Sequence, residues 1–258
     1  MLRHNRITRN EEDGIRILAN ANTGILVTGN LVENTKAFGL QLTGNAAAVV
    51  AQNSSMANGF AGIAVEQGAT AEISENPSAH NGSFGIVATL NASAAITENT
   101  VEHNRWVGIV VFGNSTATVS RNTVRFNGHH GMVVDIHSTA ELRDNIVVGN
   151  GFFPDPHLVS DNGIFVGGGA VATIRGGVVA DNASHGIHVR LSPFGPDPGT
   201  ALIGLDGDVA TAITGNGGAG IFVEDNGSLA QIDSRNIVFR DNAAGDTVGN
   251  VVDVAPGP

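Results

Sequence analysis

The chain has no cysteine, no tyrosine, one tryptophan and, in Lys36, one lysine among its 258 residues. Without cysteine, a disulfide framework and thiolate chemistry are excluded, and the redox compartment stays open. Charge is also scarce and unbalanced, because 24 acidic residues outnumber 13 basic ones and give a net charge of -11. A protein of this charge repels nucleic-acid phosphates, so we expect no nucleic-acid partner.

Long hydrophobic runs are missing as well. The sequence has no stretch of about eighteen apolar residues, so we expect no insertion into a membrane. Residues 1–5 also lack the apolar core of a signal peptide. What the chain does have is 41% apolar residues and 35 glycines, which suit a turn-rich β protein with a buried core in one domain.

An internal repeat organises the sequence. Glycines recur every 23 residues, each followed by an apolar-x-apolar pair, at Gly39, Gly62, Gly85, Gly108 and Gly131. The same phase reaches back to Gly14 and continues at Gly163, Gly186 and Gly220, once extra residues are allowed in three turns. This spacing predicts about nine coils built on one template.

Each coil contains further short strands. Period-two alternation, as in Ala94-x-Ile96 and Ala117-x-Val119, predicts a second strand with one buried face, and Val101 begins a column of inward residues for a third. No such strand buries its apolar face alone. Stacking the coils about 4.8 Å apart would pair each strand in parallel with its copies in the neighbouring coils.

Two asparagine columns accompany the glycines, one represented by Asn99 and Asn122 and the other by Asn104 and Asn127. The Gly-Ile-x-Val and Ile-x-x-Asn markers resemble, over nearly the whole chain, the right-handed parallel β-helix superfamily of pectate lyases and polygalacturonases. The resemblance implies an all-β solenoid with three short strands per coil. It also implies stacked asparagine amides that stabilise the turns, with the first asparagine in the left-handed region.

We expect a single β-helix domain over residues 1–258 that begins in the middle of a coil, because Leu2-x-x-Asn5 matches the closing half of a repeat. Missing N-terminal sequence or a partner chain would then cap the first coil.

The outward positions of the Gly-led strands are unusually apolar. Residues two and four after each glycine should face solvent, and they include Val87, Val110, Phe112, Val133, Phe165 and Phe222. Such an exposed stripe indicates a ligand, a covering segment or a partner chain.

Polar groups gather on the same predicted face, at Asp135, His137, His188, Arg190 and Glu224, and Gly167-Gly168-Gly169 would leave a notch that could hold a sugar. In pectate-lyase-like proteins this sheet and its flanking loops hold the substrate. Insertions at residues 151–162 and 191–200 flank the sheet, whereas one near residues 206–208 should project elsewhere.

The first insertion is similar to the Tyr-Gly-Phe-Asp-Pro-His-Glu motif of mannuronan C5-epimerases, with Asp155-Pro156-His157 matching its Asp-Pro-His. The resemblance implies acid and base roles shared by His157 and His188. The sequence departs from the motif where Phe152 replaces the tyrosine and Leu158 the final acid. No zinc-type spacing occurs, so we expect no bound cofactor, while Asp135, Asp155 and Asp161 leave Ca²⁺ open.

The leading hypothesis is a bacterial β-helix, secreted or at the cell surface, that binds a polysaccharide. Whether it also processes the polymer, as a lyase or a uronate C5-epimerase, stays open. The alternative is a non-catalytic structural or adhesive segment of a larger surface protein. The candidate catalytic residues are Asp135, Asp155, His157 and His188, and the candidate substrate-binding residues are Phe112, His137, Phe152, Phe165, Arg190, Phe222 and Glu224.

Overall fold

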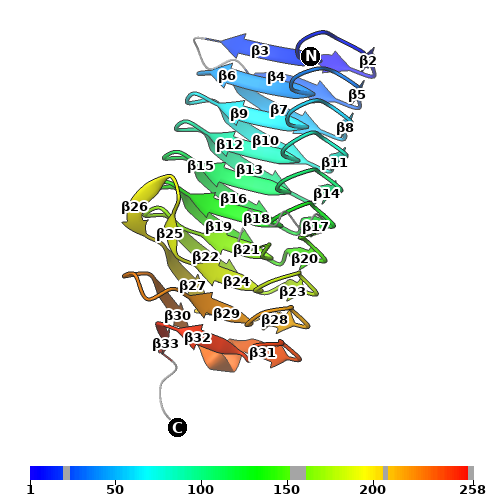
Figure 1. Cartoon of the computed structure of the whole chain (residues 1–258). Coiled ribbons are helices and arrows are strands. Elements are labelled where there is room, and N and C mark those ends of the chain that lie inside the picture. Colours follow the sequence, from blue (N-terminus) through cyan, green and yellow to red (C-terminus); the bar gives the residue numbers. More distant parts are fainter. Residues whose placement is uncertain (20–23, 152–160, 206–208, 255–258) are drawn as a thin grey trace.

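The computed structural model describes residues 1–19, 24–151, 161–205 and 209–254, and almost all of its regular structure is β-strand. Three parallel sheets run along the molecule, each built by stacking one strand from every coil (Figure 1). The chain passes through sheets A, B and C in turn and then enters the next coil. The fold is therefore a right-handed parallel β-helix with three short strands per coil, which confirms the predicted fold class.

Sheet A contains eleven of the described strands: β1 (Leu2–Arg3), β4 (Gly24–Thr28), β7 (Ala47–Ala51), β10 (Thr70–Ser74), β13 (Ser93–Thr97), β16 (Thr116–Ser120), β19 (Thr139–Arg143), β22 (Val171–Arg175), β27 (Thr200–Ile203), β30 (Leu229–Ile232) and β33 (Val251–Asp253). Sheet B contains ten: β2 (Arg6–Thr8), β5 (Leu31–Glu33), β8 (Ser54–Met56), β11 (Pro77–Ala79), β14 (Thr100–Glu102), β17 (Thr123–Arg125), β20 (Ile146–Val148), β23 (Val178–Ala180), β28 (Thr211–Thr214) and β31 (Ile237–Arg240).

Sheet C contains nine Gly-led strands and, last, one strand that follows Asp246: β3 (Ile15–Ala19), β6 (Leu40–Gly44), β9 (Ile63–Glu66), β12 (Ile86–Thr89), β15 (Ile109–Phe112), β18 (Met132–Asp135), β21 (Ile164–Val166), β24 (Ile187–Val189), β29 (Ile221–Val223) and β32 (Thr247–Gly249). Outside these sheets lie the hairpin β25 (Leu191–Ser192) and β26 (Gly195–Pro198) and one 3-10 turn, η1 (Ser234–Asn236).

Sheet C of the described chain thus has ten strands, one more than the nine predicted coils. The additional strand is β32, which pairs with β29 through Ile221 and Thr247. The repeat pattern misses it because Asp246 takes the place of the usual glycine, and its carbonyl accepts the Ile221 N–H.

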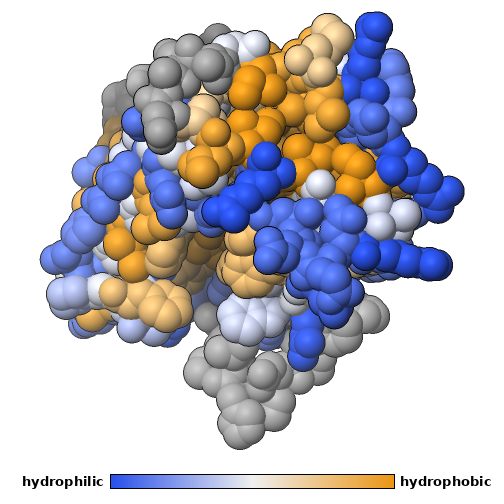
Figure 2. Space-filling model, turned by 90° about the horizontal axis from the view of Figure 1, so that it is seen from above, coloured by the Kyte–Doolittle hydropathy of each residue, from blue (hydrophilic) through white to orange (hydrophobic). Residues whose placement is uncertain are grey.

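The core is a column of aliphatic side chains inside the coils. Ile63, Ile86 and Ile109 stack in register on consecutive strands of sheet C, and all are fully buried. Burying a side chain of this size stabilises the fold by about 1.5–3 kcal/mol. Seen along the stack, apolar residues also gather on the end face, bordered by hydrophilic ones (Figure 2). In the first coil, Leu2 and Ile7 pack against the core and stay partly exposed.

The asparagine columns are structural, as predicted. The side-chain amide of Asn99 donates 3.0 Å to the Oδ1 of Asn122, and each column repeats this bond from coil to coil. One detail of the expectation was wrong: the left-handed residue is the one before the asparagine, as at Glu98 with φ 59°. The asparagine keeps a negative φ because its side chain bridges the turn to the carbonyls of Thr97 and Ile73.

Among the described residues, no helix is long and apolar enough to cross a membrane.

Candidate functional site

The outer face of sheet C carries two aligned columns of side chains. Strand pairing places Val87, Val110, Val133, Phe165 and His188 side by side in one column. A parallel column contains Glu66, Thr89, Phe112 and Asp135. Because both columns follow from the period of two along each strand, their residues were predictable from the repeat.

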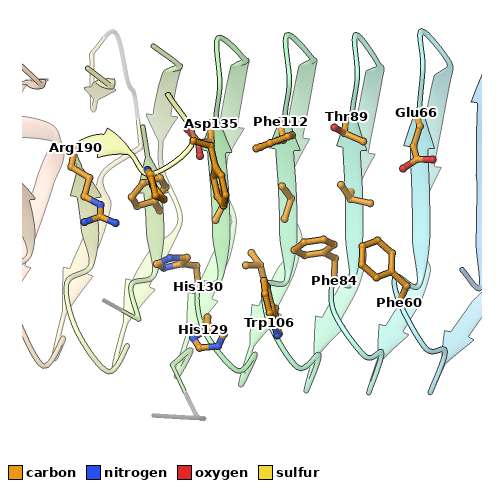
Figure 3. Close-up of a pocket in the computed structure, with 17 residues that line it drawn as sticks. Phe60, Glu66, Phe84, Thr89, Trp106, Phe112, His129, His130, Asp135 and Arg190 are labelled. Carbon is orange, nitrogen blue, oxygen red and sulfur yellow. The ribbon is translucent and has the colours of Figure 1, made fainter. Parts of the chain in front are cut away.

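A row of aromatic rings borders the first column. The rings belong to residues in the turns that lead into successive strands of sheet C, and neighbouring rings make edge-to-face contacts at centroid distances of 5.0–6.4 Å. We call this row the aromatic wall; it consists of Phe38, Phe60, Phe84, Trp106 and His129. Figure 3 shows its last four members on one side of the pocket, with Glu66, Thr89, Phe112 and Asp135 on the other.

Between these two rows lies a groove with a volume of about 430 Å³. Its floor is formed by Val87, Val110 and Val133, and Val107 lines it beside the wall. The volume falls within the usual range for binding pockets of small ligands, about 300–1,000 Å³. The lining is mostly apolar and aromatic, so the groove offers a large contact area with few hydrogen-bonding groups.

The expectation of an exposed apolar stripe was wrong for three of its residues. Val87, Val110 and Phe165 are only 5%, 6% and 4% exposed. Phe84 packs beside Val87 and Val110 in a second apolar cluster outside the coil interior. Phe165 is instead surrounded by His130, His188 and Arg190. Phe112, Val133 and Phe222 remain partly exposed.

One end of the groove is closed by a cluster around Phe165. The Phe165 ring stacks on His130 at a centroid distance of 5.4 Å and makes an edge contact with His188 at 6.0 Å. The Arg190 guanidinium lies over the same ring, 5.5 Å from its centroid. Its Nη1 is 3.5 Å from Glu224 Oε1, so the cation at this end is already paired.

The hairpin β25–β26 directly follows β24 in the chain and extends back over the groove. Phe194, at its tip, makes an edge contact with Phe112 at 6.3 Å. Ser192 donates a hydrogen bond of 2.7 Å to Asp135, and Asp197 lies 3.3 Å from His137. The first contact joins the hairpin to β18, and the second joins it to the turn that follows β18.

This hairpin fills the notch expected at residues 167–169. Gly169 N donates to the Asp197 carbonyl at 2.9 Å. A Cβ added at Gly168 would lie 3.0 Å from the Ser192 Cβ and 2.4 Å from Asp135 Oδ1. The absence of side chains at these glycines therefore lets the hairpin pack closely against them. The space for a ligand lies further along the sheet, above Val87, Val110 and Val133.

Burial sets the protonation states at the closed end. His188 is 3% exposed, and burial lowers its pKa to about 3, although its Nε2 lies 3.2 Å from Glu224 Oε1 without a well-formed hydrogen bond. Burial likewise lowers the pKa of His130 to about 4. Both imidazoles are neutral at pH 7.

Asp135 shows the opposite shift for the same reason. Burial raises the pKa of its carboxyl, while the hydrogen bonds from Ser192 and the Ile136 N–H favour the charged form and limit the rise. Each carboxyl oxygen has one of these donors, so the group is engaged within the protein.

The structure brings only part of the predicted site together. Asp135, Phe112, Phe165 and Arg190 line the groove. Four predicted residues lie near the groove without lining it. His188, Phe222 and Glu224 cluster beyond Phe165, and His137 lies against Asp197 of the hairpin. Phe152, Asp155 and His157 lie outside the described residues, so their roles stay predictions.

The aromatic wall was not predicted. Its signal in the sequence is an aromatic residue or histidine one or two positions before the repeat glycine in consecutive coils, as at Phe84 before Gly85 and Trp106 before Gly108. The position shifts by one residue between coils, so strict 23-residue periodicity does not align these residues.

For metals, the part of the chain that the structure describes has no group of three or more His, Asp or Glu side chains positioned to hold an ion. Of the aspartates considered for Ca²⁺, Asp135 accepts from Ser192, and Asp161 pairs with His129 Nδ1 at 2.8 Å.

Comparison with known proteins agrees on the fold. A family model described as "Right handed beta helix region" matches residues 45–155. A search of curated protein sequences found no significant match.

Among solved structures, the periplasmic alginate epimerase AlgG is similar at 14% identity and a TM-score of 0.60, over 90% of this chain and 61% of that one. The enzymatically active domain of tailspike protein 2 from bacteriophage CBA120 is similar at 13% identity and a TM-score of 0.57, over 97% of this chain and 42% of that one. The chain thus spans about three fifths of the AlgG structure. At these identities the likeness concerns the fold alone.

Proposed function

We propose that this protein binds a polysaccharide along the groove on sheet C, in a secreted or cell-surface setting. The observation that carries the proposal is the groove of about 430 Å³ bordered by the aromatic wall. Aromatic rings pack against the CH-rich faces of sugar rings, and apolar contact area supplies much of the affinity in such sites. Phe60 and Trp106 are 41% and 48% exposed, so both rings are accessible to a ligand.

The shape of the groove also favours a polymer. Its lining residues come from successive coils between Phe60 and Arg190, and adjacent coils are spaced by about 4.8 Å. An extended chain of sugars laid across the strands would meet a similar set of side chains at each coil. The similarity in fold to an alginate epimerase supports this proposal, since that protein is named for action on a polysaccharide.

Chemistry on the bound polymer would need more than the described groove supplies. A lyase or a C5-epimerase requires a base that removes a proton. His130 Nδ1 already accepts the Asn162 N–H at 3.1 Å, and both oxygens of Asp135 have donors. We therefore propose binding as the function of the described groove, and epimerase or lyase activity would depend on Asp155 and His157.

The alternative is a structural or adhesive segment without a ligand. A flat sheet C without a covering loop would have favoured it. Phe112, Phe165 and Arg190 instead line a groove that the β25–β26 hairpin partly covers, which supports the binding proposal.

A glycan array with and without Ca²⁺ tests the proposal. We expect the wild-type protein to bind at least one class of polysaccharide, and Trp106→Ala to weaken that binding tenfold or more. The matched control is Phe126→Ala, because Phe126 is an exposed ring, 40% accessible, that does not line the groove. No binding in either condition, or equal losses in the two variants, would reject the proposal.

A further inference from the structure

The floor of the groove has no hydrogen-bonding side chain. Val87, Val110 and Val133 lie in register on β12, β15 and β18, and the backbone between them is committed to the parallel ladder. A sugar hydroxyl pressed onto this floor would lose its water without gaining a partner. The face of a ligand that contacts the floor must therefore present CH or methyl groups.

The sides of the groove continue this apolar character. Val107 and Phe84 pack with the floor valines in one cluster, and Phe112 packs against it from the opposite side. Phe194 extends the apolar surface above Phe112. A methyl substituent on a sugar would find aliphatic and aromatic contacts on three sides here, and burial of a methyl-sized group in such surroundings is favourable.

The charges along the groove disfavour an acidic polymer. Among its described lining residues, Arg190 is the one arginine or lysine, and it is paired with Glu224 and stacked over Phe165. Glu66 and Asp135 add carboxyl groups on the same side. His130 is neutral at pH 7, because burial lowers its pKa to about 4. A polyuronate carries one carboxylate per sugar and would meet no free cation in this set.

We propose that the groove selects a neutral polysaccharide whose sugars carry methyl groups, as O-acetyl or 6-deoxy hexoses do, over a polyuronate. This inference rests on the proposed function and specifies its substrate class. The methyl groups would lie on the valine floor, and the hydroxyls would face solvent and the rim.

Binding measured by calorimetry against four purified polymers tests the inference. The first pair is a partially O-acetylated glucomannan and the same polymer after alkaline deacetylation. A rhamnan supplies 6-deoxy sugars, and alginate supplies uronates. We expect the acetylated polymer, the rhamnan or both to bind at least tenfold more tightly than the deacetylated polymer, and we expect alginate to bind most weakly. Comparing the acetylated glucomannan with the rhamnan shows whether an O-acetyl or a 6-deoxy methyl group is preferred.

Each outcome is decisive. Alginate binding as tightly as the methyl-bearing polymers, or no advantage of either methyl-bearing polymer over the deacetylated one, would overturn the inference and leave polysaccharide binding intact. Binding to none of the four, together with silence on the glycan array, would reject the proposed function itself.

A variant tests the role of the floor. Val110→Thr exchanges a methyl group for a hydroxyl at nearly constant shape, and we expect it to reduce the preference for the methyl-bearing polymer at least threefold. Val49→Thr is the matched control, because Val49 is 37% exposed on sheet A and does not line the groove. Thermal melting of both variants verifies folding. An unchanged preference in folded Val110→Thr would contradict the assignment of selectivity to the floor.

Discussion

Ser192 Oγ donates a hydrogen bond of 2.7 Å to Oδ2 of Asp135, although the two residues are 57 positions apart in the sequence. Both side chains are buried, and Asp135 is only 3% exposed. The bond joins the β25–β26 hairpin to β18, and the same hairpin carries Phe194 to its contact with Phe112. The position of the hairpin over the groove therefore depends on a buried carboxyl group.

Replacing Ser192 should loosen this connection. Ser192→Ala leaves a buried Asp135 oxygen without its donor, which should lower the free energy of unfolding by about 1–3 kcal/mol. Urea denaturation measures the change. Ser93→Ala removes an exposed hydroxyl from β13 and should have almost no effect. Equal stability of the two variants would show that the bond does not hold the hairpin.

Stability should also fall in acid because of His188. Its pKa is lowered from 6.5 to about 3 in the folded protein, so below pH 6.5 the unfolded chain binds a proton that the folded chain does not. The contribution of the neutral, buried His188 to the free energy of unfolding is therefore present above pH 6.5 and is lost as the pH falls toward 3. Between pH 6.5 and 4.5, the titration of His188 alone should lower the free energy of unfolding by about 2 kcal/mol.

His188→Phe tests this pH dependence, because it keeps an aromatic ring beside Phe165 and Phe222 and removes the titrating group. Urea denaturation between pH 4.5 and 7 should give a flatter stability curve for this variant than for the wild type. His103→Phe, at an exposed turn position, is the control and should keep the wild-type slope. A wild-type slope in His188→Phe would contradict the burial of a neutral imidazole.

The asparagine column predicts a large loss from a single substitution. Asn99 is 1% exposed; its side-chain amide donates to Ile73, Thr97 and Asn122, and its Oδ1 accepts from Asn76. Asn99→Ala leaves several of these buried groups unpaired, so we expect a loss of at least about 3 kcal/mol by urea denaturation. Asn114→Ala, at an exposed turn outside the column, should cost far less. Similar losses of stability in the two variants would mean that water replaces the hydrogen bonds of the Asn99 side chain.

Most of the fold was predictable from the sequence because every coil repeats the same physical demands. Gly85 and Gly108 admit no side chain, since an added Cβ would lie 2.2 and 2.4 Å from a valine of the following coil. Ile86 and Ile109 bury the face of each strand. Such a local pattern, repeated every 23 residues, specifies strands, turns and parallel stacking together.

The groove was only half predictable. Its floor follows from strand alternation, whereas its wall uses two neighbouring turn positions, since Phe84 lies one position after the one that Trp106 occupies in the next coil. The hairpin depends on the contact between Ser192 and Asp135, which no local pattern encodes. This contact joins residues 57 positions apart, so spacing in the sequence does not reveal it.

The most direct test of the binding groove uses the single tryptophan of the chain as its reporter. Trp106 lies in the aromatic wall and is 48% exposed, so its fluorescence responds to a ligand in the groove with no contribution from another tryptophan. Titration with the polysaccharide that binds best should give a saturable blue shift of the emission, with a midpoint equal to the calorimetric Kd. An unchanged spectrum at saturating polysaccharide would contradict binding in this groove.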